Sequence, residues 1–124
     1  MKIEDIKHPE LKQLINMIYL HEENNNQEMI EKTDNEIKDY LKDNIFIISS
    51  ENNEYFTIPY GNDGEYVIPI FTDSIEYERG MEYYDLNEMS ENKDFMIKKI
   101  EKVDDPNCLG YLINIASVSY ITLL

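Results

Sequence analysis

Residues 65–80 read EYVIPIFTDSIEYERG, and this stretch decides the fold because an apolar run meets a charged segment within it. Five of its first seven side chains are apolar or aromatic, as in a buried strand. Asp73 then stands where it can cap a helix, with Glu76 three residues later as in a capping box. Gly80 can end the same short helix in the left-handed conformation. The stretch therefore predicts a strand that leads into a helix, and helix initiation alone accounts for residues 72–74.

A hairpin is predicted at this junction, over residues 55–71 (YFTIPYGNDGEYVIPIF). Two apolar runs flank the turn at 61–64, whose Gly, Asn and Asp residues tolerate the positive φ angles of a tight turn. Pro59 and Pro69 lack an N–H, so each strand is expected to have an edge or a bulge at its proline. Before the hairpin, the β-branched apolar run NIFIIS at 44–49 predicts a buried strand.

Two helices are predicted at the N-terminal end of the sequence. The first covers residues 8–23, with Pro9 at the first helical position, where its missing N–H costs nothing. Three asparagines at 24–26 separate it from the second, which runs from about residue 27 to 42. The apolar pattern is weaker around 33–35, so a kink or a break is possible there. The side chains expected to face inward are Leu11, Leu14, Ile15, Ile18, Ile30, Ile37, Tyr40 and Leu41.

The remaining third of the sequence is predicted to hold a strand at 81–86 (MEYYDL), a helix at 88–103 and two short strands within 111–124 (YLINIASVSYITLL). The whole is one domain, residues 1–124, of the α+β (mixed α/β) class. It has two N-terminal helices, a small mixed sheet of about five to six strands, and further helices after the hairpin and before the last strands. The helix at 88–103 is expected to turn Met89, Phe95, Met96, Ile100 and Val103 inward.

The chain is strongly acidic, with 26 acidic against 11 basic residues and a net charge of −15. Residues 51–91 hold eleven acids and a single base, Arg79, which makes −10 for this segment. The balance argues against binding to nucleic acid or to an anionic membrane, both of which need clustered Lys and Arg. A field of this sign can attract a basic protein. The competing explanation is an ordinary solvated surface that keeps the protein soluble.

No motif in the sequence indicates catalysis, a cofactor or a metal site. His21 lacks a second His four residues on, as a zinc helix needs, and His8 at a helix start is expected to be solvated. The glycines at 61–65 do not fit a calcium loop, and the serines lack a Gly-x-Ser-x-Gly elbow. Cys108 is the only cysteine and is expected to be a packed thiol. Because no apolar run approaches ~20 residues and no signal-peptide core is present, the chain is interpreted as cytoplasmic.

The order of elements and several local strings resemble the SseB N-terminal domain family, named for enhanced serine sensitivity. PELKQLINMI (9–18) resembles the family's opening Leu-rich helix, and IKDYLKDNIFIIS (37–49) resembles its helix that runs straight into a strand. VIPIFTDSIEYERG (67–80) matches its strand that ends in Phe-Thr before a helix. GYLINIASVSYITL (110–123) is similar to its apolar strand entering Asn-Pro, although Ile115 replaces that Pro. The resemblance implies a small mixed α/β domain without established enzymatic activity, and it carries over no catalytic residue.

An acidic and aromatic band at 76–91 (EYERGMEYYDLNEMSE) is the remaining candidate site. Tyr and Met are enriched in recognition surfaces because they provide contact area with adaptable polar ends. The alternative is that alternate tyrosines belong to the core and the acids are their solvated neighbours. The residues predicted to bind a partner are Tyr77, Glu78, Glu82, Tyr83, Tyr84 and Asp85.

The favoured function is a non-catalytic, acidic protein-interaction module whose partner is another protein, and the charge would suit a basic one. One alternative is an immunity-type or nucleic-acid-mimicking inhibitor of a basic toxin or nuclease. Another is an enzyme or small-molecule binder whose site does not show in the sequence, which a deep pocket with a perturbed acid would favour. The oligomeric state stays open, because exposed sheet edges near the proline-bearing strands could pair into a dimer.

Overall fold

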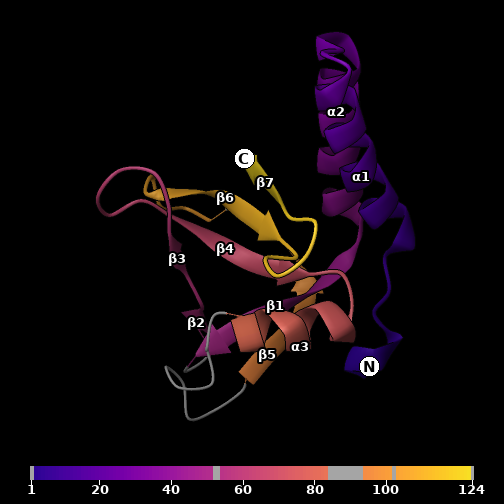
Figure 1. Ribbon diagram of the computed structural model, residues 1–124. Coiled ribbons are helices and arrows are strands. Elements are labelled where there is room, and N and C mark those ends of the chain that lie inside the picture. The colour runs from indigo at the N-terminus through magenta and orange to yellow at the C-terminus, as the bar shows by residue number, and fades with distance from the viewer. Residues whose placement is uncertain (1, 52–53, 84–93, 102, 124) are drawn as a thin grey trace.

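The computed structural model describes residues 2–51, 54–83, 94–101 and 103–123, which form three α-helices and a seven-stranded mixed sheet (Figure 1). The α+β class predicted from the sequence is confirmed. In chain order the elements are η1, a short 3-10 helix (Ile3–Asp5), α1 (Pro9–Glu23), α2 (Gln27–Asp43), β1 (Ile45–Glu51), β2 (Glu54–Tyr55), β3 (Ile58–Pro59), β4 (Tyr66–Phe71), α3 (Ser74–Tyr83), β5 (Asp94–Lys99), β6 (Cys108–Ile113) and β7 (Tyr120–Leu123).

The sheet places the ends of two strands that are distant in sequence side by side. Its strands lie in the order β2-β1-β4-β6-β7, with β5 paired to β1 and β3 paired to β4. β4 and β6 run parallel, whereas the other described pairs run antiparallel. The carboxyl ends of β4 and β6 therefore meet at one edge, where Ile70 is paired with Ile113. In open α/β sheets, such an edge is where ligands are usually bound.

α1 and α2 stand side by side and cover one face of the sheet (Figure 1). Pro9 occupies the start of α1 as predicted, and the side chain of Asn26 caps α2 by accepting a hydrogen bond from the Met29 N–H at 3.3 Å. α2 is continuous, so the structure has no break at 33–35, where the side chain of Thr33 is buried. The core on this face consists of Leu11, Ile15, Ile18, Ile37, Leu41, Phe46, Ile48, Ile68, Ile70, Tyr111 and Ile113.

α3 packs on the opposite face, where a second core cluster joins Ile6, Ile47, Phe71, Tyr77 and Met81. Gly80 does not end this helix, contrary to the prediction, because α3 continues to Tyr83. The glycine instead allows close packing, since a Cβ built on it would lie 2.4 Å from Cε1 of Phe71.

The strand predicted at 81–86 and the helix predicted at 88–103 are both wrong where the structure describes them. Residues 81–83 belong to α3, and 94–99 form β5, which pairs with β1 over six residues, from Ile45↔Lys99 to Ser50↔Asp94. The free edge of β1 gives this segment backbone partners that a local apolar pattern does not reveal. Residues 84–93 and 102 lie outside the described part of the chain.

The predicted hairpin is confirmed, with β3 paired to β4 and positive φ angles at Gly61 (84°) and Gly64 (86°). Along the same edge of β4, residues 66–67 pair with β3 and 70–71 pair with β1. Pro69 therefore falls between the two partners, where no N–H is needed. The two C-terminal strands are also confirmed as β6 and β7. Among the described residues, no helix is long and apolar enough to span a bilayer.

Candidate functional site

The predicted partner-binding residues divide between the two sides of α3. Glu78, Glu82 and Tyr83 are exposed, whereas Tyr77 is only 6% exposed and packs edge-on against Phe71 with ring centroids 5.5 Å apart. The alternative reading of the tyrosines as core residues therefore describes Tyr77. Tyr84 and Asp85 lie outside the described residues.

The outward side of α3 also carries two residues outside the predicted set. Ile75 is 61% exposed and Arg79 is exposed, and both lie on the face that carries Glu78, Glu82 and Tyr83. Glu78, Arg79, Glu82 and Tyr83 follow Ile75 by three, four, seven and eight residues, which is the spacing of one helix face. We call these five residues the outer face of α3. In the sequence Ile75 resembles its buried neighbours, and only its exposure in the structure distinguishes it from the core residues.

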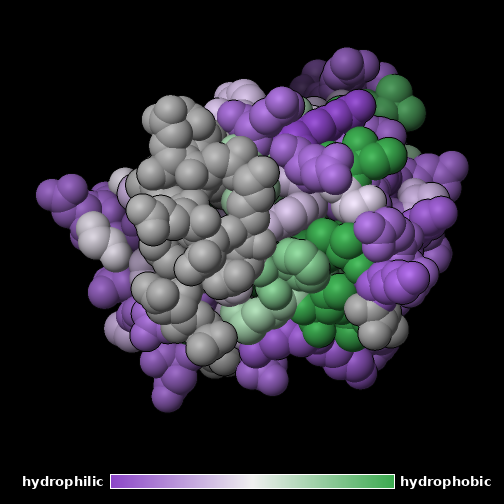
Figure 2. Space-filling view, turned by 90° about the horizontal axis from the view of Figure 1, so that it is seen from below, coloured by the Kyte–Doolittle hydropathy of each residue, from purple (hydrophilic) through white to green (hydrophobic). Residues whose placement is uncertain are grey.

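The end of the molecule that carries α3 also exposes apolar surface. Seen from below, apolar side chains gather in a green patch on a surface that is otherwise largely hydrophilic (Figure 2). The second core cluster lies at this end and includes Ile3, Ile45 and Ile97, which are partly exposed. Phe95 in β5 is 41% exposed, and its ring packs edge-on against that of Tyr77 with centroids 5.6 Å apart.

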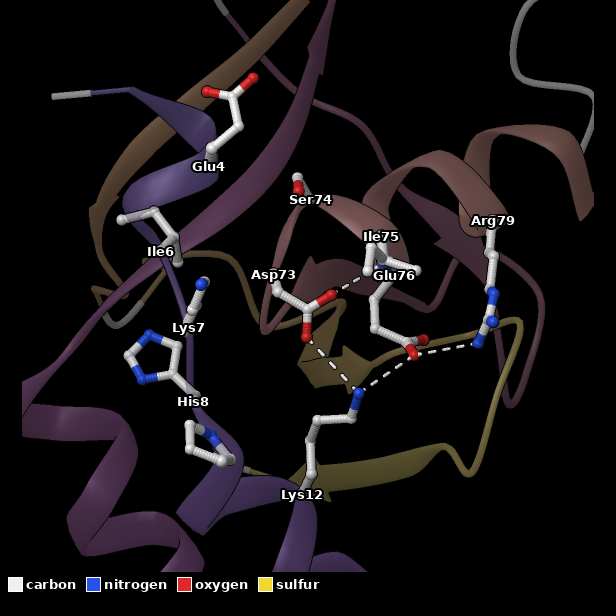
Figure 3. A pocket seen from close by; sticks show the side chains of 11 residues that line it. Glu4, Ile6, Lys7, His8, Lys12, Asp73, Ser74, Ile75, Glu76 and Arg79 are labelled. Carbon is white, nitrogen blue, oxygen red and sulfur yellow. Dashed lines mark hydrogen bonds and ion pairs between the residues drawn. The ribbon is translucent and has the colours of Figure 1, made fainter.

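A groove of about 410 Å³ separates the N-terminal segment from the start of α3 (Figure 3). Its volume lies within the usual range for ligand sites. We call it the α3 groove. One wall comes from the segment that enters α1 and the other from the β4–α3 junction. The groove is lined by Glu4, Ile6, Lys7, His8, Pro9, Lys12, Asp73, Ser74, Ile75, Glu76 and Arg79.

Asp73 caps α3 as predicted, but Glu76 does not complete the capping box. Oδ1 of Asp73 accepts a hydrogen bond from the Glu76 N–H at 2.9 Å, and the Asp73 carbonyl accepts one from the Tyr77 N–H at 3.1 Å. The side chain of Glu76 points instead to two cations. Its Oε1 lies 3.3 Å from Nζ of Lys12 and 3.5 Å from Nη1 of Arg79.

Lys12 joins the two walls of the groove. Its Nζ also lies 3.5 Å from Oδ2 of Asp73, so one ammonium bridges two carboxylates (Figure 3). Glu76 is only 2% exposed, and its Oε2 is buried without a hydrogen-bond partner among the described residues. Nothing in the local sequence predicted this contact, because Lys12 and Glu76 are 64 residues apart and meet only when α1 packs near α3.

His8 is a structural residue, not the solvated one that the sequence suggested. It is buried; its Nδ1 lies 2.7 Å from Oη of Tyr40 and its Nε2 lies 2.6 Å from the carbonyl oxygen of Ile45. A carbonyl can only accept, so Nε2 is the donor to Ile45, and in the neutral ring Nδ1 then accepts from the Tyr40 hydroxyl. Burial raises the pKa of Tyr40, which keeps this hydroxyl protonated as a donor. Both ring nitrogens are thus engaged in joining α1, α2 and β1.

The carboxyl ends of β4 and β6 are locked together beside the groove. Nδ2 of Asn114 donates to Oγ1 of Thr72 at 3.0 Å, and the Thr72 N–H donates to Oδ1 of Asn114 at 3.0 Å. Asn114 holds a positive φ of 53°, which Asn tolerates better than most residues. A second cavity of about 190 Å³ lies here, lined by Lys12, Asn16, Glu76, Asn114, Ser117 and Val118. Lys12 and Glu76 therefore border both cavities.

Charged and hydrogen-bonding groups dominate this corner. Lys12, Arg79, Asp73 and Glu76 form a network at one end of the groove, and the described residues contain no group of three His, Cys, Asp or Glu side chains that could hold a metal ion. Burial raises the pKa of the Cys108 thiol, away from the thiolate form that attacks substrates.

No family model, no curated protein and no solved structure matches the chain. The resemblance to the SseB N-terminal domain therefore stays a prediction, and the functional argument has to come from the geometry described above.

Proposed function

We propose that this protein is a non-catalytic interaction module of the cytoplasm that binds a basic protein partner through the outer face of α3. The observation that carries the proposal is the pairing of exposed apolar and acidic side chains on one helix face. Ile75 is 61% and Tyr83 68% exposed, and Glu78 and Glu82 lie exposed between them along the helix.

This composition is typical of a recognition surface. Large apolar and aromatic side chains supply most of the binding energy when a partner removes them from water. The acids beside them select a partner of opposite charge and accelerate its approach, an effect that a net charge of −15 extends over the whole molecule. An exposed helix face of this kind suits a partner that lays a groove or a helix against it.

The state of the reactive side chains supports a binding function over a catalytic one. His8 has both ring nitrogens engaged in hydrogen bonds within the protein, which leaves it no nitrogen to act as a base. Cys108 has a raised pKa because of its burial, so it is a poor nucleophile at neutral pH.

The test is affinity purification from the native lysate with two matched charge variants. The first carries Glu78→Lys and Glu82→Lys on the outer face of α3. The second carries Glu31→Lys and Glu36→Lys, two exposed acids of α2, and changes the net charge by the same amount. Partners bound by the unaltered protein are identified by mass spectrometry and then measured against both variants.

We expect the affinity of the α3 variant for the basic partner to fall by about 100-fold, because a like charge in an interface costs several kcal/mol. The affinity of the α2 variant should fall much less. Equal losses would mean that only the overall charge matters. Equal retention by both variants would show that α3 is not the contact surface. Either result would refute this assignment.

A further inference from the structure

The carboxylate of Glu76 has unused hydrogen-bonding capacity at the α3 groove. A carboxylate offers about four acceptor positions on its two oxygens. Only Oε1 is engaged by the described residues, and Oε2 is buried without a partner. Buried polar atoms are nearly always paired in folded proteins, so a partnerless oxygen next to a groove points to a donor that is supplied from outside.

Arg79 forms only a weak ion pair with this carboxylate. It reaches Glu76 through a single contact of 3.5 Å between Nη1 and Oε1, and 59% of its side chain remains exposed. A well-placed arginine instead binds a carboxylate with two parallel N–H donors, one to each oxygen. The geometry of Arg79 is that of a weak surface pair, whose loss costs the protein little.

The walls of the groove suit the rest of an arginine side chain. Ile6, Pro9 and Ile75 provide apolar surface along which an aliphatic stem can lie while its charged head reaches a carboxylate. Glu4 stands on the opposite wall and adds a third acid to Asp73 and Glu76 (Figure 3). Lys12 already bridges Asp73 and Glu76, so the incoming cation has to compete with Arg79 and leaves Lys12 in place.

We propose that the α3 groove binds a guanidinium group, namely an arginine side chain of the protein partner, which displaces Arg79 and bonds both carboxylate oxygens of Glu76. This inference rests on the proposed function, because the α3 groove would bind one basic residue of that partner beside the outer face of α3. A guanidinium fits better than an ammonium, because its planar fork matches the two oxygens while an ammonium is a single point charge.

The probe is N-acetyl-L-arginine amide, whose blocked ends leave the guanidinium as its only charge. It is titrated into the protein at low ionic strength, and binding is followed by the backbone amide NMR signals. The signals of residues 74–79 and of Lys7 are expected to shift together. The neutral analogue N-acetyl-L-citrulline amide is expected to bind at least tenfold more weakly, because the charge-assisted bonds are lost.

Two variants should act in opposite directions. Glu76→Gln is expected to weaken binding of the probe about tenfold or more. Arg79→Met removes the competing cation and is expected to tighten binding several-fold. Glu36→Gln, a change at an exposed position of α2 that removes the same charge, serves as the control and should leave the probe's affinity within about twofold. Because Arg79→Met predicts a gain, loss of folding cannot imitate it, even if Glu76→Gln proves unstable.

Unchanged or weaker binding by Arg79→Met would overturn the proposal, as would equal binding by a folded Glu76→Gln protein. Free L-arginine that binds tenfold tighter than the blocked probe would overturn the assignment to a protein side chain and indicate a small-molecule site. If the probe does not bind but the Glu78→Lys, Glu82→Lys variant still fails to bind the partner, this inference alone is refuted. A bound probe with no effect of those two changes would refute the proposed function alone.

Discussion

At the scale of single residues, His8 illustrates how a side chain beside the groove can serve the fold. Replacing His8 by Phe keeps an aromatic ring against Phe46, which lies 4.5 Å away between centroids, but removes both hydrogen bonds. The Ile45 carbonyl and the Tyr40 hydroxyl then lose their partner. We expect the free energy of unfolding to fall by about 2 kcal/mol, measured by urea denaturation. Lys7→Ala, an exposed change next in sequence, is the control; a His8→Phe protein as stable as this control would show that the two bonds contribute nothing.

A second prediction at this scale concerns pH. Tyr66 donates a hydrogen bond of 2.7 Å to Oδ2 of Asp105, which ties β4 to the loop before β6. This bond raises the pKa of Tyr66 to about 12 from its usual 10.0. The pKa of Asp105 is lowered, first by the hydrogen bond from the Asn107 N–H and then by Tyr66.

The directions of the two pKa shifts define two pH ranges in which this hydrogen bond stops stabilising the fold. A raised pKa on Tyr66 means that its contribution is complete below pH 10 and is lost as pH rises toward about 12. A lowered pKa on Asp105 means that its contribution is complete above the usual value of 3.8 and is lost as pH falls through the folded-state pKa. The difference in unfolding free energy between the unaltered protein and Tyr66→Phe should be constant from pH 5 to 9 and shrink above pH 10. A difference that grows above pH 10 would contradict this bond.

At the scale of elements, local sequence patterns predicted those elements that carry their own signals. The Pro9 start of α1, the glycine turn of the hairpin and the Asp73 cap of α3 were all readable because each satisfies a local backbone requirement. β5 was missed because what makes it a strand is the free edge of β1, more than forty residues earlier in the chain. The sequence predicted part of the candidate site, namely the exposed acids of α3. It did not predict the buried ion pair of Glu76, which depends on Lys12 and so on the packing of α1.

The contact between α3 and the sheet yields a prediction for Gly80. Alanine inside a helix is worth about 1 kcal/mol more than glycine, so the local effect of Gly80→Ala is favourable. Its Cβ, however, would lie 2.4 Å from Cε1 and 2.9 Å from Cζ of Phe71, whose side chain is fully buried. We expect the clash to dominate and the free energy of unfolding to fall by about 1–3 kcal/mol, measured by thermal or urea unfolding.

Glu78→Ala is the matched control for Gly80→Ala, because it changes an exposed position of the same helix and should stay within about 0.5 kcal/mol. A double-mutant cycle with Phe71→Leu identifies the cause. The smaller side chain makes room for the Cβ, so Gly80→Ala should cost less in that background. A cost that is independent of residue 71 would assign the effect to the helix backbone and contradict the close packing.

At the scale of the whole molecule, the net charge of −15 is expected to affect the stability of the fold and the proposed binding. Exposed acids repel one another more in the folded state than in the expanded unfolded chain, and salt screens this repulsion: the Debye length falls from about 30 Å at 0.01 M to about 10 Å at 0.1 M. We therefore expect the protein to become more stable as NaCl rises over this range. In a domain of this size, a rise of about 4 °C in melting temperature corresponds to about 1 kcal/mol.

The same salt should weaken binding of the partner, because the attraction between opposite charges is screened as effectively as the repulsion between like ones. Opposite responses of stability and affinity to one variable separate this electrostatic account from a general salt effect on apolar surface, which would strengthen both. The Glu31→Lys, Glu36→Lys variant carries four fewer units of negative charge and should show a smaller salt response in melting temperature. A melting temperature that falls with NaCl would show that the local pairs of Lys12 with Asp73 and Glu76 outweigh the repulsion of the surplus acids, and the charge would then be a binding feature with no cost to the fold.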